Sequence, residues 1–224
     1  MKYAIVFPGQ GSQSLGMLAD LADNFPIVKD TFTEASDALG FDLWALTQND
    51  QAALNQTQNT QPAMLAAGVA TYRALTSEAA LSPVCMAGHS LGEYSALVAA
   101  GALNFSDGIG LVRTRAQLMQ SAVPEGVGAM AAILGLEDEV VVKVCSDYAG
   151  EGIVQAVNFN SNGQVVIAGN KAAVDATCEA MKAAGAKRAV VLPVSVPSHC
   201  PLMDDAAAEF KIAVDAVAFN MGDV

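Results

Sequence analysis

The chain contains two histidines, His89 and His199, and the first of them lies in the pentapeptide Gly88-His89-Ser90-Leu91-Gly92. This pentapeptide fits the G-x-S-x-G pattern, in which a sharp turn between a strand and a helix raises a serine hydroxyl above the edge of a sheet. A short apolar run precedes the pattern and an alanine-rich run follows it. The sequence therefore predicts that Ser90 is a nucleophile.

A serine hydroxyl is a weak nucleophile unless a base removes its proton. Adjacent residues that leave a tight turn point away from each other, so we expect His89 to pack against or bond to a neighbouring loop instead of reaching the Ser90 hydroxyl. His199 lies in a loop rich in proline and serine, and catalytic groups collect in the loops of a rigid scaffold. We therefore predict that His199 is the base.

When a serine attacks a carbonyl group, an oxyanion forms, which backbone N–H groups stabilise. The helix that follows Ser90 leaves free N–H groups at its start, and the N–H of Leu91 is the donor next to the nucleophile. The loop Phe7 to Gln13 also follows a short β-prone run, and its glycines lack the spacing of a nucleotide-binding loop. We predict that this loop supplies a second oxyanion donor, the N–H of Gln10.

Two arginines, Arg113 and Arg115, share a predicted helix but project to different sides of it, because successive residues turn by roughly 100°. Arg113 lies on a polar face, whereas Arg115 lies among leucine, valine and methionine side chains. A guanidinium on an apolar face keeps its charge and requires a partner. A buried carboxylate of the chain and a substrate carboxylate gripped by two hydrogen bonds are the two alternatives for Arg115.

Strands and helices in the first half of the chain are expected to position these residues. They are a strand over Lys2 to Phe7, a helix over Pro26 to Leu39, a short apolar turn over Leu43 to Leu46, a helix over Pro62 to Thr76 capped by Thr60 or Gln61, a strand over Val84 to Ala87, and a helix over Asp107 to Ser121 capped by Ser106 or Asp107.

The second half of the chain has a different pattern of predicted elements, which follow the order β-α-β-β-α-β. They cover Val127 to Leu134, Glu137 to Tyr148, Ile153 to Phe159, Gln164 to Ala168, Lys171 to Ala184 and Lys187 to Val194, before a last helical run over Leu202 to Val217. This order matches the ferredoxin-like motif. We predict an α/β protein in which a small subdomain, residues 126–196, is inserted into a large subdomain formed by residues 1–125 and 197–224.

Composition excludes several classes of protein. The chain has 224 residues, of which 53% are hydrophobic and 15% charged, with a net charge of −12. So apolar a chain is not disordered, and its acidity argues against a nucleic-acid partner.

The longest uncharged stretch carries five asparagine and glutamine side chains, so we expect no membrane span. The four cysteines lie far apart, without C-x-x-C, so neither a zinc site nor a redox motif is indicated. We expect no metal and no cofactor. The short apolar run after Lys2 is no signal peptide, and we predict a cytoplasmic protein.

Taken together, the motifs closely resemble those of the bacterial malonyl-CoA:acyl carrier protein transacylase family. The residues that carry the resemblance are Phe7-Pro8-Gly9-Gln10-Gly11-Ser12-Gln13, Thr60-Gln61-Pro62-Ala63, Gly88-His89-Ser90-Leu91-Gly92-Glu93-Tyr94, Arg115, Asn158-Phe159-Asn160-Ser161 and Val194-Ser195-Val196-Pro197-Ser198-His199, and they occur in family order through essentially the whole chain.

The resemblance implies a malonyl transfer from malonyl-CoA to the phosphopantetheine thiol of acyl carrier protein, in fatty acid synthesis. It implies that Ser90 becomes malonylated with His199 as its base, that Arg115 binds the free malonyl carboxylate, and that Gln61 lines the pocket. Gln10 and Leu91 are similar to the family's oxyanion donors. The family fold is a hydrolase-like α/β subdomain with an inserted ferredoxin-like one.

Family members continue beyond position 224, so the resemblance also implies that the C-terminal part of the family fold is absent and that a truncated chain is slow and prone to associate. Two other functions stay open. A hydrolase-type serine esterase would need an acid between the serine and the histidine, for which Asp107, Glu125 and Asp147 are available but poorly placed. An inactive, truncated chain would be only a binding module for CoA or the carrier protein.

Overall fold

The computed structural model describes residues 2–124, 126–194 and 196–222. Its contacts divide the chain into two compact units, one formed by Met1–Gln117 with Phe210–Val224 and the other by Leu118–Glu209. Glu125 and Ser195, which the sequence analysis named, lie outside the described residues. Each unit has its own sheet and its own hydrophobic core.

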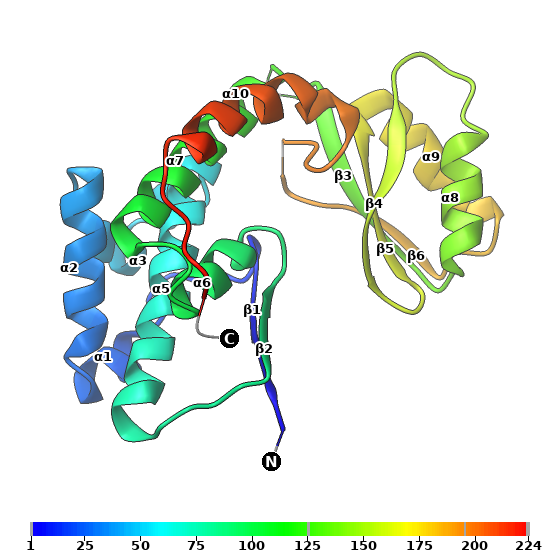
Figure 1. Cartoon of the computed structure of the whole chain (residues 1–224). Helices are drawn as coiled ribbons and strands as arrows, with labels where there is room; N and C mark the ends of the chain where they lie inside the picture. The colour runs from blue at the N-terminus through cyan, green and yellow to red at the C-terminus, as the bar shows by residue number, and fades with distance from the viewer. Residues whose placement is uncertain (1, 125, 195, 223–224) are drawn as a thin grey trace. The chain divides into compact units, whose positions relative to one another are not determined.

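The first unit is built around a two-stranded parallel sheet, whose strands β1 (Ala4–Phe7) and β2 (Cys85–Gly88) lie side by side (Figure 1). Phe7 pairs with Gly88 at the carboxyl end of both strands. The helices of this part of the chain are α1 (Ala19–Asn24), α2 (Ile27–Leu39), α3 (Leu43–Asn49), α4 (Gln51–Leu54), α5 (Thr57–Glu78), α6 (Gly92–Ala99) and α7 (Phe105–Ser121). Because β1 and β2 end together, the two loops that carry the predicted oxyanion donors begin at the same edge.

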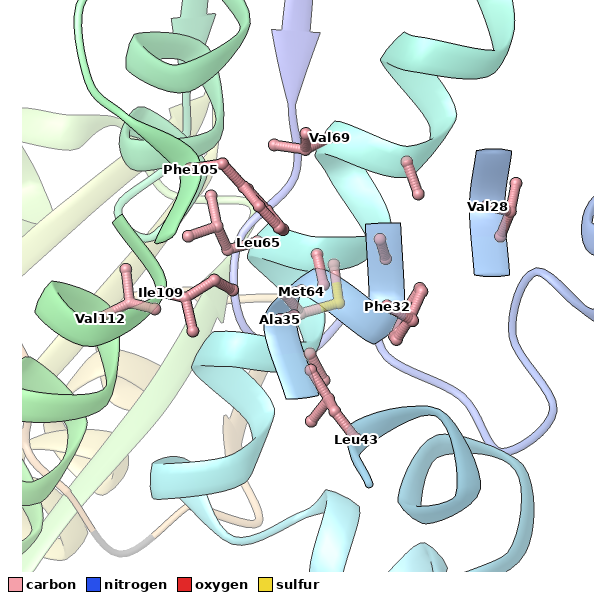
Figure 2. Packing of buried hydrophobic residues seen from close by; sticks show 14 of the residues in the cluster. Val28, Phe32, Ala35, Leu43, Met64, Leu65, Val69, Phe105, Ile109 and Val112 are labelled. Atoms are coloured by element: carbon pink, nitrogen blue, oxygen red, sulfur yellow. The ribbon is translucent and has the colours of Figure 1, made fainter. Parts of the chain in front are cut away.

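The core of the first unit is made by helices. Phe32 and Ala35 of α2, Leu65 of α5 and Ile109 of α7 are buried and pack in one cluster (Figure 2). α5 packs against both α2 and α6. Burial of these apolar faces is the main force that fixes the helices in place, and it anchors α5 and α7, which bear Gln61 and Arg115.

The second unit contains a four-stranded antiparallel sheet. Its strands and helices are β3 (Gly128–Leu134), α8 (Asp138–Ser146), β4 (Val154–Ser161), β5 (Gln164–Asn170), α9 (Lys171–Ala183) and β6 (Arg188–Val191), and the strand order in the sheet is β4-β5-β3-β6. Strands β3 and β5 and helices α8 and α9 share one buried apolar cluster. A 3₁₀ helix (Pro201–Met203) and α10 (Asp204–Asp215) follow.

The chain is therefore an α/β protein, as the sequence predicted, and its described residues form a parallel and an antiparallel sheet. In the described residues, no helix is both long enough and apolar enough to span a membrane.

One boundary prediction was wrong. Pro62 does not begin a helix, because α5 starts five residues earlier, at Thr57. The preceding turn is stabilised by Thr60, whose hydroxyl donates to the carbonyl oxygens of Leu54 (by a short bond) and Gln56 (3.1 Å). A proline inside a helix leaves the carbonyl four residues earlier without its donor, and here the carbonyl of Gln58 accepts a hydrogen bond from Arg113 over 2.7 Å.

Two smaller predictions were also wrong. The run from Leu43 to Leu46 is not a turn but the first part of α3, which Asp42 caps by accepting from the Ala45 N–H over 2.8 Å. The cap of α7 is Asn104. Its side-chain oxygen Oδ1 accepts from the N–H of Ser106 at 2.9 Å and from the N–H of Asp107 at 3.3 Å.

Candidate functional site

Ser90 stands at the sharp turn between β2, which ends at Gly88, and α6, which begins at Gly92. Its φ is +52°, in the left-handed region that residues other than glycine seldom adopt. Such backbone strain persists only where the surrounding structure holds it, and it occurs preferentially at functional sites. The conformation is the one that the G-x-S-x-G pattern requires of its serine.

The two glycines of the pattern are needed because the turn is packed against its surroundings. A Cβ on Gly88 would collide with the carbonyl of Gly92, and a Cβ on Gly92 would collide with the backbone of Phe7. The start of α6 thus lies directly on the end of β1. Only hydrogen side chains permit this approach, which fixes the position of Ser90 over the sheet.

The residues predicted to supply the oxyanion donors, Gln10 and Leu91, lie in the loops that follow β1 and β2. After Ser90, the N–H groups of Gly92, Glu93 and Tyr94 donate within the turn and the first helical turn, to the carbonyls of His89, Ser90 and Leu91. Among the residues that the structure describes, the N–H of Leu91 donates to no carbonyl, so it is available to a ligand.

The loop that bears Gln10 packs against the serine turn. A Cβ on Gly9 would stand 3.1 Å from Nδ1 of His89, so the His89 ring lies against this loop, as expected from the sequence. The His89 N–H also donates to the carbonyl of Phe7 over 3.0 Å. The side chain of Gln10 donates from Nε2 to the Thr57 hydroxyl over 3.2 Å, which ties the loop to the first residue of α5.

Arg115 reaches the predicted nucleophile. Its Nη2 donates to Ser90 Oγ over 3.1 Å, and its Nη1 donates to Oε1 of Gln61 over 2.9 Å. Gln61 is 1% exposed, so the guanidinium is held by a rigid, buried amide. In the described structure these two oxygens, neither of them a carboxylate, are the hydrogen-bond acceptors of Arg115.

Burial lowers the pKa of Arg115, and the nearby Tyr94 and Glu93 act in the opposite direction. An arginine keeps its proton even so, which leaves a positive charge beside Ser90 with no directly bonded carboxylate among the described residues. Such a charge favours an anionic ligand.

Sequence reasoning assigned no role to Tyr94. The guanidinium of Arg115 lies over its ring, 5.9 Å from the centroid, and Phe210 packs against it edge to face at 6.3 Å. Burial raises the pKa of Tyr94, while the charge of Arg115 lowers it. The signal was present in the sequence, because Tyr94 follows Ser90 by four residues, about one helical turn.

His199 lies in the second unit, in the short loop before the 3₁₀ helix, and it too has a left-handed backbone, with φ of +65°. Its neighbours fix this loop: Ser198 N–H donates to the Val196 carbonyl over 2.9 Å, and Cys200 Sγ donates to the Pro197 carbonyl over 3.1 Å. Because Ser90 belongs to the first unit, the pairing of the two side chains stays a prediction.

Two of the acids that an esterase could use, Asp107 and Asp147, belong to the residues that the structure describes, and each is exposed or paired. Asp107 is exposed in the first turn of α7. Asp147 forms an ion pair with Lys143, with Nζ of the lysine 2.8 Å from Oδ2 of the aspartate. The described residues contain no cluster of three or more metal-ligating side chains.

Comparison with known proteins places this geometry in a family. The family model of the acyl transferase domain matches residues 4–223. The malonyl CoA-acyl carrier protein transacylase of Escherichia coli K12 is 58% identical over 220 residues, which are 98% of this chain and 71% of the relative.

Two solved structures are similar over the whole chain. One is the malonyl CoA-acyl carrier protein transacylase of Coxiella burnetii, with 50% identity and a TM-score of 0.98 over 71% of that chain. The other is a malonyl-transacylase in complex with its type II PKS acyl-carrier protein, with 55% identity and a TM-score of 0.98 over 72% of that chain. The chain belongs to the acyl transferase family, among the malonyl CoA-acyl carrier protein transacylases.

Proposed function

We propose that the chain transfers a malonyl group from malonyl-CoA to the phosphopantetheine thiol of acyl carrier protein, in fatty acid biosynthesis. The observation that carries the proposal is the guanidinium of Arg115 held 3.1 Å from Ser90 Oγ by the buried Gln61. Malonyl places a carboxylate one methylene away from its thioester carbonyl. A cation beside the nucleophile therefore suits this acyl group and has no partner in acetyl. The names of the relatives support the same substrates.

In the first half of the reaction, Ser90 Oγ attacks the thioester carbonyl while His199 takes the hydroxyl proton. The N–H groups of Gln10 and Leu91 bind the oxyanion of the tetrahedral intermediate, and each such donor contributes roughly 100- to 1,000-fold in rate. The C–S bond then breaks, His199 returns its proton to the CoA sulfur, and malonyl stays on Ser90 as an ester.

The second half runs through the same groups in reverse. The phosphopantetheine thiol of the carrier protein loses its proton to His199 and attacks the malonyl ester. The C–O bond breaks, and His199 protonates Ser90 Oγ. Arg115 holds the malonyl carboxylate throughout, so the same cation positions the acyl group in both transfers.

We further propose the division of the chain that the sequence predicted, with residues 1–125 and 197–224 as a hydrolase-like subdomain and residues 126–196 as a ferredoxin-like insertion. The order β-α-β-β-α-β and the antiparallel strand order β4-β5-β3-β6 support this proposal. The cytoplasmic location stays a prediction.

The test looks for the covalent malonyl ester on Ser90. The protein is mixed with malonyl-CoA, quenched in acid and analysed by mass spectrometry, with peptide mapping of the adduct. We expect one malonyl group on Ser90, none in Ser90→Ala, and a normal adduct in the control Ser106→Ala, whose serine is exposed on α7. His199→Ala should slow adduct formation far more than His89→Gln. An adduct that persists in Ser90→Ala would contradict the assignment.

A further inference from the structure

Pro62 gives α5 an unusual feature near its start. The helix spans Thr57–Glu78, so Pro62 lies in its interior. Proline has no N–H, and its ring pushes away the carbonyl of the residue four positions earlier. The residue in that position is Gln58, whose carbonyl therefore lacks its usual helical donor.

Arg113 of α7 takes the place of that donor. Its Nη1 donates to the Gln58 carbonyl and to Oδ1 of Asn59, each over 2.7 Å. The guanidinium also lies over the ring of Phe41, 5.5 Å from the centroid. Burial lowers the pKa of Arg113, in keeping with a charge that is partly removed from water and held by the chain.

The two arginines of α7 together fix how this helix is rotated against α5. Arg113 and Arg115 are two residues apart and so point roughly 200° apart around the helix axis, at 3.6 residues per turn. Arg113 binds Gln58 and Asn59, and Arg115 binds Gln61, all within the first turns of α5. Two contacts on different sides of α7 resist a rotation that a single contact would allow.

We propose that Arg113 is a positioning residue for malonyl selectivity: by binding the Gln58 carbonyl that Pro62 exposes, it fixes the rotation of α7 that directs Arg115 at Ser90. This inference rests on the proposed function, because it takes Arg115 as the partner of the malonyl carboxylate. In this proposal Arg113 acts through Arg115 and not on the substrate itself.

The experiment compares three variants with the wild type in rates of Ser90 acylation by malonyl-CoA and by acetyl-CoA, with the melting temperature measured in parallel. Arg113→Met should lower the malonyl-to-acetyl ratio of kcat/KM by roughly 5- to 20-fold, the range typical of indirect coupling, and leave the acetyl rate unchanged. Arg113→Lys keeps a donor for the carbonyl and should recover most of the ratio.

Pro62→Ala separates positioning from stability. Alanine restores the helical N–H as a donor to the Gln58 carbonyl, which should raise the melting temperature and still lower the malonyl-to-acetyl ratio. A ratio that stays at the wild-type value in Arg113→Met and Pro62→Ala overturns the proposal. So does a loss of both rates in step with the melting temperature. A wild-type protein that forms no malonyl ester instead overturns the proposed function.

Discussion

Arg115 donates from Nη2 to Ser90 Oγ over 3.1 Å, so the predicted carboxylate-binding cation lies in direct contact with the predicted nucleophile. The bond uses the serine oxygen as an acceptor, so it does not engage the hydroxyl proton. We expect the carboxylate of a bound malonyl group to compete for the guanidinium and to release the oxygen for attack. The contact thus links recognition of the acid group to exposure of the nucleophile.

Arg115→Ala should reverse the preference for malonyl over acetyl. A hydrogen bond to a charged group contributes about 1.5–3 kcal/mol, so kcat/KM for malonyl-CoA should fall by roughly 10- to 100-fold, while acetyl-CoA, which has no carboxylate, should be used as well as before or better. The measurement is kcat/KM for both thioesters. An unchanged ratio would mean that Arg115 has a structural role only.

Gln61→Leu should weaken malonyl binding through Arg115. Leucine keeps the volume of the side chain but removes Oε1, which accepts from Arg115 over 2.9 Å. The buried guanidinium then loses one of its two fixed partners and becomes mobile. We expect a higher KM for malonyl-CoA, by roughly 10-fold, with a smaller change in kcat. Gln61→Glu is the matched comparison: its carboxylate should neutralise Arg115 and abolish malonyl selectivity altogether.

Gly88→Ala should prevent correct folding of the serine turn, because the added Cβ would collide with the carbonyl of Gly92. We expect loss of soluble protein, or a large drop in the melting temperature with no activity. Gly110→Ala is the control on α7, where a Cβ meets nothing within 4 Å. Alanine is about 0.5–1 kcal/mol better than glycine in a helix, so this variant should be slightly more stable and fully active.

Stability should decrease at alkaline pH because of a buried thiol. Burial, and to a lesser extent Cys178, raises the pKa of Cys145 from 9.0 to about 11. The thiol therefore ionises at a lower pH in the unfolded chain than in the folded one. The contribution of the neutral thiol to the free energy of unfolding is complete below pH 9 and is lost as the pH rises to about 11. Urea unfolding under reducing conditions at pH 8, 9.5 and 10.5 measures this loss. Cys145→Ala should show a shallower dependence, and an identical slope in both proteins would exclude this thiol as the cause.

Docking of an acidic carrier protein on a chain of net charge −12 should depend on local cations. Three cations lie close together in the sequence of the second unit, Lys182, Lys187 and Arg188, and Lys182 is paired with Glu179 at 2.7 Å. We therefore expect Lys187→Glu with Arg188→Glu to raise the KM for the carrier protein and to leave malonyl-CoA kinetics unchanged.

The matched control for this double variant is Lys143→Glu, which changes an exposed lysine on α8 that is paired with Asp147. It should leave the KM for the carrier protein close to the wild-type value. If control and double variant behave alike, the docking surface lies elsewhere.

The serine turn could be predicted from the sequence because its requirements are local. A β-prone run, two glycines around Ser90 and an alanine-rich run are enough to specify a strand, a tight turn and a helix, and the structure has β2, a left-handed Ser90 and α6. The pairing of Ser90 with His199 had no such local basis, because the two residues are 109 positions apart, and it stays a prediction.

The partners of the arginines were decided by the tertiary structure. The sequence left two partners open for Arg115, a carboxylate of the chain and a substrate carboxylate. In the described structure its acceptors within the chain are Ser90 and Gln61, so the first alternative is not seen and the second stays a prediction. The sequence also placed Pro62 at the start of a helix, because a proline inside a helix leaves a carbonyl without a donor. That donor comes from Arg113, 55 residues away from Gln58 along the chain. A local pattern shows that a carbonyl of the segment needs a hydrogen-bond donor. Only the packed fold brings that donor, a side chain from a distant part of the sequence, into contact with it.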